Sequence, residues 1–380
     1  MKLAIVTETF PPEVNGVAMT FGIIAQELSR RGHQVTVYRP ERRDLPDRET
    51  GKQYRVSTLP GFRIPGYPEI KMGFPARSRL EREWRMDRPD FVHVVTEGPL
   101  GASAVSAARS LKLPVTSSFH TNFHSYAGHY GCGPLKSLAV SWLRRVHNRT
   151  ARTFAPTPEL CGELGAMGFK RLGVLSRGVD MRSFSPLRRS LKLRGEWRAA
   201  ADNPVVLHVG RLAPEKNYPL LFRIYAAMRT ANPRLRFVLA GEGPLQKSLQ
   251  REHSECIFAG FFSREEIGRY YASADIYVHA STTETFGNVL TEAMASGLAV
   301  AGFDYAAAQQ FMRNGENGLT APTGNEKALS AAAVRLATDH ALRLRLRSAA
   351  PASLAEQSWA KVIGRFEADL AAIATQDACS

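Results

Sequence analysis

The apolar and polar positions in the first half of the chain alternate between two kinds of segment. Short apolar runs that end at glycine, proline or polar residues are typical of strands, and they occupy residues 3–6, 34–38, 91–95, 114–119 and 153–157. Longer segments with helical spacing of apolar residues lie between them, as at 19–31 and 101–112. This alternation predicts an α/β fold, in which a parallel sheet carries helices on both faces.

The same alternation returns from residue 205 to about residue 354, and it predicts a second α/β domain. Residues 186–203 are polar and irregular, which is typical of a crossing between domains. We therefore expect a first domain at 1–185, a linker at 186–203 and a second domain at 204–355. A last helix falls within the terminal segment 356–380.

The composition is that of a folded protein without a membrane span. A chain of 380 residues, with 44% hydrophobic and 22% charged residues, is typical of a soluble protein with two domains of ordinary size. No apolar stretch approaches the ~18 residues of a spanning helix, and the N-terminus becomes acidic at Glu8, too early for a signal peptide. The four cysteines have no paired spacing. We expect a reduced, cytoplasmic location and no metal centre.

The net charge of +15 favours an anionic partner, and it is concentrated in the first domain. Residues 1–185 carry 27 basic against 16 acidic side chains, and the rest of the chain carries 23 against 19. No nucleic-acid-binding motif accompanies this excess, so we expect no nucleic-acid partner. An anionic membrane or a charged ligand remains, although part of the charge can simply keep the protein soluble.

A basic amphipathic helix is predicted at 134–149. Its apolar positions follow helical spacing: Leu135, Leu138, Ala139, Trp142, Leu143 and Val146. The other face carries Lys136, Arg144, Arg145 and Arg149. Two interpretations stay open: a helix packed on the sheet with a solvated basic face, or a basic face on anionic lipid, where each residue contributes on the order of 1 kcal/mol. The basic stretch 77–88 fits both.

Two glutamates eight residues apart, Glu284 and Glu292, frame a predicted anion site. A buried strand precedes Glu284, and the turn Phe286-Gly287-Asn288-Val289 leads into a helix that contains Glu292, roughly two turns along. The first amides of a helix are free to bind a phosphate, and the positive helix end favours it. Each carboxylate can then reach one end of a ligand whose anion lies between them. From the spacing alone, two solvated glutamates around a helix cap are as good an interpretation.

A second motif supports the anion site. The strand 205–209 leads into Gly210, with Arg211 and Lys216 five residues apart on the following loop. Two cations on one loop can bracket a diphosphate. Further strands that end at glycine follow, at Gly-Glu-Gly-Pro (241–244) and at 257–261.

This ordered set of motifs resembles the family 4 retaining glycosyltransferases of the GT-B fold, over nearly the whole chain. The resemblance implies two Rossmann-like domains facing across a cleft, with the acceptor on the first and the nucleotide sugar mainly on the second, and a last helix that packs back on the first domain. It assigns Glu284 to the sugar hydroxyls and Glu292 to the ribose, and it offers no protein nucleophile. Arg211, Lys216 and the amides of Phe286, Gly287, Asn288 and Val289 would stabilise the leaving diphosphate in place of a metal.

Two first-domain residues gain a role from the resemblance. Gly16 lies in a loop after the first strand, where relatives place a glycine loop against the diphosphate-sugar. His120 follows the strand at 114–119, where relatives place a histidine near the transferred sugar. By themselves, an Asn-Gly turn and a structural histidine would explain both.

Two departures from the family pattern concern the sugar. Thr285 follows the first glutamate where most relatives have glycine, and 304–310 lacks the glycines and the carboxylate that many carry. The sequence around Glu284 is similar to that of family members that glycosylate lipids, using GDP-mannose or UDP-sugars. We expect a hexose transferred from a GDP- or UDP-hexose to a membrane lipid or lipid-linked acceptor, without a cofactor.

Other functions fit the sequence less well. A soluble or polysaccharide acceptor stays open as the alternative within the family. A dinucleotide-binding oxidoreductase is disfavoured because no Gly-x-Gly-x-x-Gly follows the first strand. An inactive binding module is disfavoured because His120, Arg211, Lys216, Glu284 and Glu292 are all present.

Overall fold

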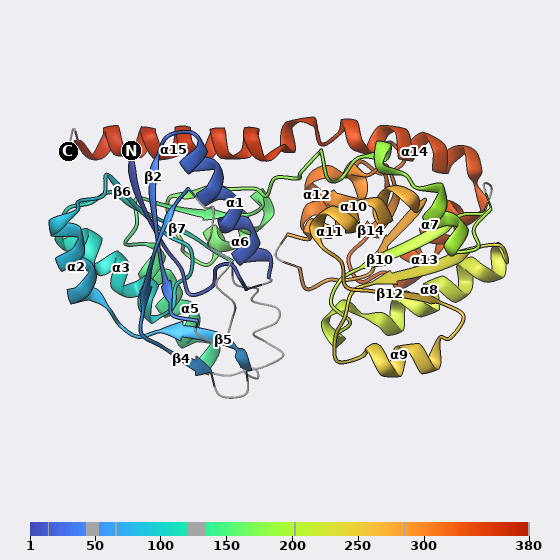
Figure 1. Ribbon diagram of the computed structural model, residues 1–380, viewed down its shortest axis with the longest axis horizontal. Coiled ribbons are helices and arrows are strands. Elements are labelled where there is room, and N and C mark those ends of the chain that lie inside the picture. Colours follow the sequence, from blue (N-terminus) through green and yellow to red (C-terminus); the bar gives the residue numbers. More distant parts are fainter. Residues whose placement is uncertain are drawn as a thin grey trace. The chain divides into compact units, whose positions relative to one another are not determined.

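The computed structural model describes residues 1–13, 15–42, 53–64, 67–120, 134–200, 203–284 and 286–378. It divides into two compact units (Figure 1). Unit 1 comprises Met1–Arg177 and Ala360–Ser380, and unit 2 comprises Gly178–Trp359. Residues 186–203, which we expected to link two domains, form η1 (Pro186–Arg188) and α7 (Leu191–Glu196) within unit 2.

A parallel sheet forms the centre of unit 1. Within its described residues, seven strands pair in the order β3-β2-β1-β6-β7-β8-β9. Their bounds are β1 Lys2–Val6, β2 Gln34–Pro40, β3 Arg55–Leu59, β6 Phe91–Val94, β7 Val115–Ser118, β8 Arg152–Ala155 and β9 Leu172–Val174. A separate antiparallel pair, β4 (Gly61–Ile64) and β5 (Tyr67–Gly73), adds a hairpin.

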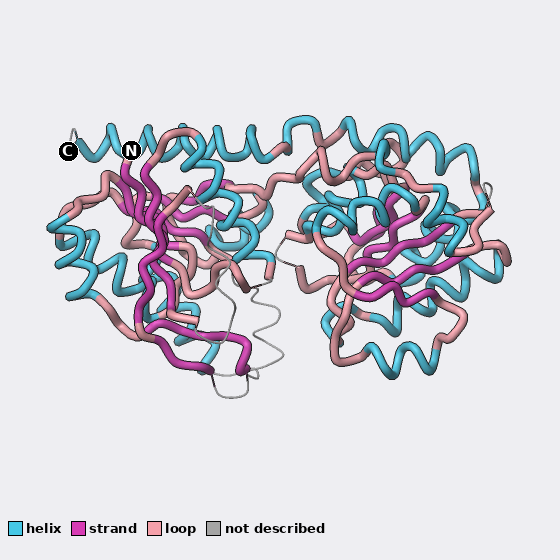
Figure 2. Tube along the Cα trace, in the orientation of Figure 1, coloured by secondary structure: helices cyan, strands magenta, loops and turns pink. Residues whose placement is uncertain are grey.

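Helices cover both faces of this sheet, as Figure 2 shows by the helical segments on either side of the strands. They are α1 Gly16–Arg30, α2 Arg77–Met86, α3 Pro99–Ser110, α5 Pro134–His147, α6 Pro158–Ala166 and α15 Trp359–Ala378. On one face, Leu80 and Trp84 of α2 and Val105 of α3 pack against Val92 and Val94 of β6. Apolar residues that alternate along each strand serve both layers, which is why the runs are almost wholly apolar.

The last helix, α15, packs on the other face of the unit 1 sheet. The ring of Phe366 contacts His93 of β6 and Phe154 of β8, with ring centroids 5.1 Å and 5.4 Å away. Glu367 binds Arg31 and His33 at 2.9 Å and 2.7 Å. An apolar stripe with a flanking ion-pair cluster therefore attaches the C-terminal segment to the N-terminal unit.

Unit 2 is also a parallel α/β unit. In the part of it that the structure describes, six strands pair in the order β12-β11-β10-β13-β14-β15. They are β10 Val205–Val209, β11 Arg236–Ala240, β12 Ile257–Gly260, β13 Ile276–His279, β14 Ala299–Phe303 and β15 Leu319–Ala321. The remaining helices are η2 Pro214–Lys216, α8 Tyr218–Ala231, α9 Gln246–Glu252, α10 Arg264–Ser273, α11 Asn288–Ala295, α12 Ala307–Phe311, α13 Glu326–Thr338, α14 His340–Ala352 and η3 Ala355–Gln357.

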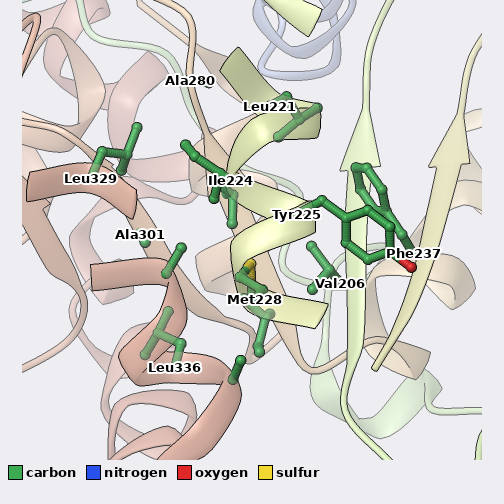
Figure 3. Packing of buried hydrophobic residues seen from close by; sticks show 14 of the residues in the cluster. Val206, Leu221, Ile224, Tyr225, Met228, Phe237, Ala280, Ala301, Leu329 and Leu336 are labelled. Atoms are coloured by element: carbon green, nitrogen blue, oxygen red, sulfur yellow. The ribbon is translucent and has the colours of Figure 1, made fainter. Parts of the chain in front are cut away.

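Two apolar clusters fill the space between this sheet and its helices. Figure 3 shows one of them, in which Ile224 and Met228 of α8 and Leu329 and Leu336 of α13 belong to one packed cluster with side chains of the strands. The second joins the opposite sheet face to α7, α10 and α11. Both clusters make the sheet a rigid platform for the loops at its edge.

A buried carboxylate explains why the segment 186–197 belongs to unit 2. Asp275 precedes β13 and accepts hydrogen bonds from Arg189, Arg194 and Arg347 at 2.9, 2.9 and 2.7 Å, and from the amide of Val205 at 2.9 Å. Burial alone would raise the pKa of Asp275, but the three guanidinium groups hold it below its ordinary value. Arg189 and Arg194, in the segment that we expected to be a linker, thus bind one buried carboxylate of unit 2.

No helix among the described residues combines the length and the apolar character that crossing a bilayer requires.

Candidate active site

An ion pair at the carboxyl edge of the unit 2 sheet joins two loops that are distant in sequence. Because β10 and β13 are parallel neighbours, the loops that follow them leave at the same edge. The Nζ atom of Lys216 lies 2.5 Å from Oε1 of Glu284. The hydroxyl of Thr283 donates to the carbonyl of Glu215 at 3.1 Å. The fold therefore brings together two residues that the sequence singled out separately.

The glycine turns support the loop that carries Arg211. The amide of Leu212 donates to the carbonyl of Glu242 at 2.9 Å. A Cβ atom added to Gly241 would lie 1.9 Å from the carbonyl oxygen of Gly210, so no side chain fits there. The Gly-Glu-Gly-Pro segment therefore packs beneath the loop after β10, and the side chain of Arg211 is exposed above it.

Gly287 is the N-cap residue of α11, at the same edge. Its φ of +92° lies in the left-handed region that favours glycine. A Cβ atom there would lie 3.7 Å from Nε2 of His279 and 3.8 Å from the Cβ of Glu284. The start of α11 thus faces both the strand end and the first glutamate, and the first-turn amides of Asn288 and Val289 are in the position where a helix binds an anion.

The other residues of this turn divide between core and site. The ring of Phe286 is buried with Leu290 in the core, and its carbonyl accepts a hydrogen bond from the amide of Ala307 at 2.9 Å. The side-chain oxygen of Asn288 is buried and has no hydrogen-bond partner among the described residues. Thr285, which departs from the family pattern, lies outside the described residues.

Glu292 lies in the second turn of α11 and contacts α10. Its Oε2 accepts a hydrogen bond from the hydroxyl of Tyr271 at 3.3 Å. Its Oε1 lies 3.9 Å from Nη2 of Arg264. Burial raises the pKa of Glu292 to about 7, against the charge of Arg264 and the hydrogen bond of Tyr271, which lower it. A carboxyl group with this pKa titrates near neutral pH.

No sequence motif indicated a role for Arg264 or His279. Burial lowers the pKa of His279 to about 4, so its imidazole is neutral at physiological pH. A position at the end of a strand, beside a glycine turn, is the signal that could have identified His279. Arg264 is the first residue of α10, in a polar stretch of sequence that does not predict a buried contact. Only the packing of α10 against α11 brings it close to Glu292.

Gly16 begins α1 at the carboxyl end of β1. The side-chain oxygen of Asn15 caps the helix by accepting the amides of Val17 and Ala18 at 3.1 Å and 2.9 Å. A Cβ atom on Gly16 would lie 2.7 Å from Nη1 of Arg177. The missing side chain thus makes room for the buried guanidinium of Arg177 at the helix start. The sequence did not predict this neighbour.

His120 lies just beyond β7, with its ring edge-to-face against Phe21 at 5.5 Å. Both ring nitrogens are buried without a partner in the described ranges, which stop at residue 120 and resume at 134. Burial, and then the charge of Arg177 followed by His93 and His147, holds the pKa of His120 well below its ordinary value. The imidazole is therefore neutral, and it can donate one hydrogen bond from one ring nitrogen and accept one at the other.

The orientation of α5 differs from the one that its apolar spacing suggested. Leu143 and Val146 are buried, but the side chains of Leu138 and Trp142 are 65% and 52% exposed. Arg145 stands one further turn along and is also exposed. Leu138 and Trp142 therefore do not pack on the sheet, because Leu143, Val146 and His147 fill that contact. We call Leu138, Trp142 and Arg145 the α5 stripe; Leu135 lies among residues whose side chains are not described.

The basic residues of α2 are arranged differently. Arg77 and Arg85 bind Glu81, and Arg79 binds Glu83, all at helical i,i+4 spacing. Pairs of this kind are neutralised within the helix, so they favour the solvated interpretation for 77–88.

Cationic groups, rather than a cluster of metal ligands, gather at the described site residues. Within the described ranges, no three His, Cys, Asp or Glu side chains converge in a way that could hold a metal ion. Lys216, the exposed Arg211 and the start of α11 all present positive charge at one edge of the unit 2 sheet, which suits a ligand with two adjacent phosphates.

Comparisons with known proteins agree with this geometry. A family model described as "Glycosyltransferase Family 4" matches residues 14–183, and one described as "Glycosyl transferases group 1" matches 190–353. The GDP-mannose-dependent alpha-mannosyltransferase of Mycolicibacterium smegmatis is 34% identical over 97% of this chain and 98% of its own length. The alpha-monoglucosyldiacylglycerol synthase of Streptococcus pneumoniae is 26% identical over 79% of this chain and 70% of its own.

A solved structure supports the fold. Anabaena HepE in complex with UDP superposes with a TM-score of 0.79 at 19% identity, over 98% of this chain and 100% of that one. The predicted GT-B fold, with two Rossmann-like α/β units, is confirmed.

The chain belongs to the family 4 glycosyltransferases of the GT-B fold, so the resemblance seen in the sequence is confirmed. It is a hexosyltransferase.

Proposed function

We propose that this protein transfers mannose from GDP-mannose to a lipid acceptor, with retention of the anomeric configuration. The observation that carries the proposal is identity above 30% over nearly the whole chain to mannosyltransferases that depend on GDP-mannose. The acceptor class is supported by relatives of lower identity whose names specify a diacylglycerol product.

The roles of the donor-side residues follow from where charge develops. When the bond between the sugar and the diphosphate breaks, negative charge grows on the phosphate oxygens. Lys216, Arg211 and the amides at the start of α11 offer positive charge that is already positioned, which is the arrangement that lowers such a barrier. Glu284 bonds Lys216 and is the group that we assign to the sugar hydroxyls; Glu292 would bind the ribose.

In unit 1, we assign Gly16 and His120 to the sugar side of the reaction. Gly16 opens the start of α1, beside the guanidinium of Arg177. His120 presents a neutral imidazole whose two nitrogens lack partners within the described ranges, so that a sugar hydroxyl could satisfy one of them.

The acceptor proposal requires that the protein reach a membrane surface. The α5 stripe combines an exposed tryptophan and leucine with a basic residue, and Arg144 of the same helix and Arg149, just after it, are also exposed. An amphipathic ring at the depth of lipid headgroups, with basic side chains near the phosphates, is the arrangement of interfacial helices. Peripheral binding to an anionic cytoplasmic leaflet is therefore part of the proposal.

The test is a screen of nucleotide sugars by product formation, with and without a lipid extract. We expect GDP-mannose to give a mannolipid and UDP-glucose to give no glucolipid, and we expect GDP to raise the melting temperature more than UDP does. Transfer to a soluble or polysaccharide acceptor in the absence of lipid would favour the alternative acceptor. Transfer from UDP-glucose alone would refute the mannose donor.

A further inference from the structure

We propose that Arg264 is a positioning residue for the nucleotide: it favours the ionised form of the Glu292 carboxylate and keeps that carboxylate aimed at the two ribose hydroxyls. The inference rests on the proposed role of Glu292 in binding the ribose. Arg264 lies outside the motifs that define the family in this chain, and only the tertiary contact between α10 and α11 connects it with the site.

The geometry assigns a different neighbour to each oxygen of Glu292. Oε2 is occupied by the hydroxyl of Tyr271, a fully buried ring that cannot swing away. Oε1 lies 3.9 Å from Nη2 of Arg264, too far for a direct hydrogen bond but close enough for strong charge attraction. One carboxylate oxygen is thus anchored, while the other keeps acceptor capacity for a ligand.

Arg264 is itself held in place. Its guanidinium lies over the ring of Phe184, 5.3 Å from the ring centroid. A cation over an aromatic face is attracted to it and loses freedom to turn away. Asp180 also interacts electrostatically with Arg264. The charge beside Glu292 is therefore fixed in position rather than carried by a freely rotating side chain.

The need for such a residue follows from the burial of Glu292. A carboxylate that accepts two hydroxyl groups must be ionised, and burial opposes ionisation. The charged or titratable groups that interact with it among the described residues include Arg264 and Tyr271 from α10, and Tyr277 from β13. Arg264 is the cation among them, so its removal leaves Glu292 protonated over a wider pH range.

The test compares GDP with 2′,3′-dideoxy-GDP, which lacks both ribose hydroxyls. The ratio of their dissociation constants isolates the ribose contact, because titration of the phosphates affects both ligands alike. In the wild type we expect GDP to bind more tightly than its dideoxy analogue at high pH. This advantage should shrink below the pKa of Glu292 in the ligand-free protein, about 7. In Arg264→Gln the pH at which it begins to shrink should move up by roughly one unit.

Two variants separate this role from a structural one. Arg264→Lys keeps the charge and should keep the wild-type profile. Arg269→Gln removes an exposed arginine from the same helix and should also leave the profile unchanged. Coincident profiles for Arg264→Gln and the wild type would overturn the inference alone. A wild-type ratio of about one at every pH would overturn the ribose role of Glu292 as well, and with it this inference.

Discussion

At the scale of single residues, Lys216 and Glu284 make the contact on which the proposed chemistry depends most directly. Both side chains are about four-fifths buried, at 21% and 18% exposure, so their attraction is less screened than that of a surface pair. In the absence of a ligand, the pair keeps a cation and a carboxylate at the carboxyl edge of the sheet. In the proposed mechanism, a diphosphate-sugar brings partners for both: the phosphates for Lys216 and the sugar hydroxyls for Glu284.

Replacing Lys216 by alanine should lower kcat by roughly 10²-fold or more, because it removes charge from the leaving diphosphate. Turnover at saturating donor is the measurement. Lys247→Ala, an exposed lysine on α9, serves as the matched control and should behave as wild type. If Lys216→Ala turned over normally, Lys216 would have no part in the chemical step.

At the scale of elements, buried charge decides how segments attach. The segment with η1 and α7 is held to unit 2 by Arg189 and Arg194, which share the carboxylate of Asp275 with Arg347 of α14. Because this carboxylate is 6% exposed and the arginines depend on it, its loss leaves buried cations without compensation.

Asp275→Asn should lower the free energy of unfolding by about 3 kcal/mol or more, the scale for a broken buried pair. Urea unfolding measures it, with Asp304→Asn, an exposed site, as the control. The pKa of Asp275 is depressed when folded, so its contribution is complete above the ordinary value of 3.8 and is lost as the pH falls through the lower folded pKa. A variant as stable as the wild type at pH 7 would show that the arginines do not need this carboxylate.

The α5 stripe gives a second prediction at this scale. The protein should sediment with vesicles that contain anionic lipid more than with neutral ones, and salt should weaken this binding because exposed charges are screened over ~10 Å at 0.1 M. The double substitution Trp142→Ser and Arg145→Glu should reduce binding and leave the thermal stability unchanged, since both side chains are exposed.

Arg82→Glu on α2, an equally exposed basic site, is the control for charge alone and should lower binding less. Equal sedimentation with neutral and anionic vesicles would contradict a membrane role for the stripe and would favour a soluble acceptor.

At the scale of the whole molecule, we expect the positive charge to serve more than one function. The net charge of +15 attracts anionic donors and surfaces from a distance. Locally, the loop after β10 carries the cations that we propose bind the diphosphate. The same excess would give the protein affinity for anionic surfaces in general, so measurements of lipid binding should be made at physiological salt.

Activity should persist in excess EDTA, because Arg211 and Lys216 supply the charge that a divalent ion supplies in other transferases. Transfer from GDP-mannose before and after chelation is the measurement. Abolished transfer that Mg²⁺ or Mn²⁺ restores would show that these side chains do not suffice.

The sequence alone determined the fold class, the two α/β units and which charged residues stand at the carboxyl edge of the unit 2 sheet. Local patterns carry this information, since strand and helix periodicities follow from neighbouring residues, and a glycine turn after a strand specifies where a parallel sheet presents its loops. The peripheral strands of unit 1 were less visible: the edge strands β3 and β9 and the separate β4–β5 hairpin have too few apolar positions for a period to show.

Only the tertiary structure decided which side chains meet. Arg177 lies against Gly16, Arg264 lies beside Glu292, and three arginines converge on Asp275 through contacts between segments far apart in sequence. The same holds for α5, where spacing allowed two faces to pack and the fit of Leu143 and Val146 against the sheet selected one. Periodicity specifies that a helix has an apolar side, but packing specifies how much of that side is covered.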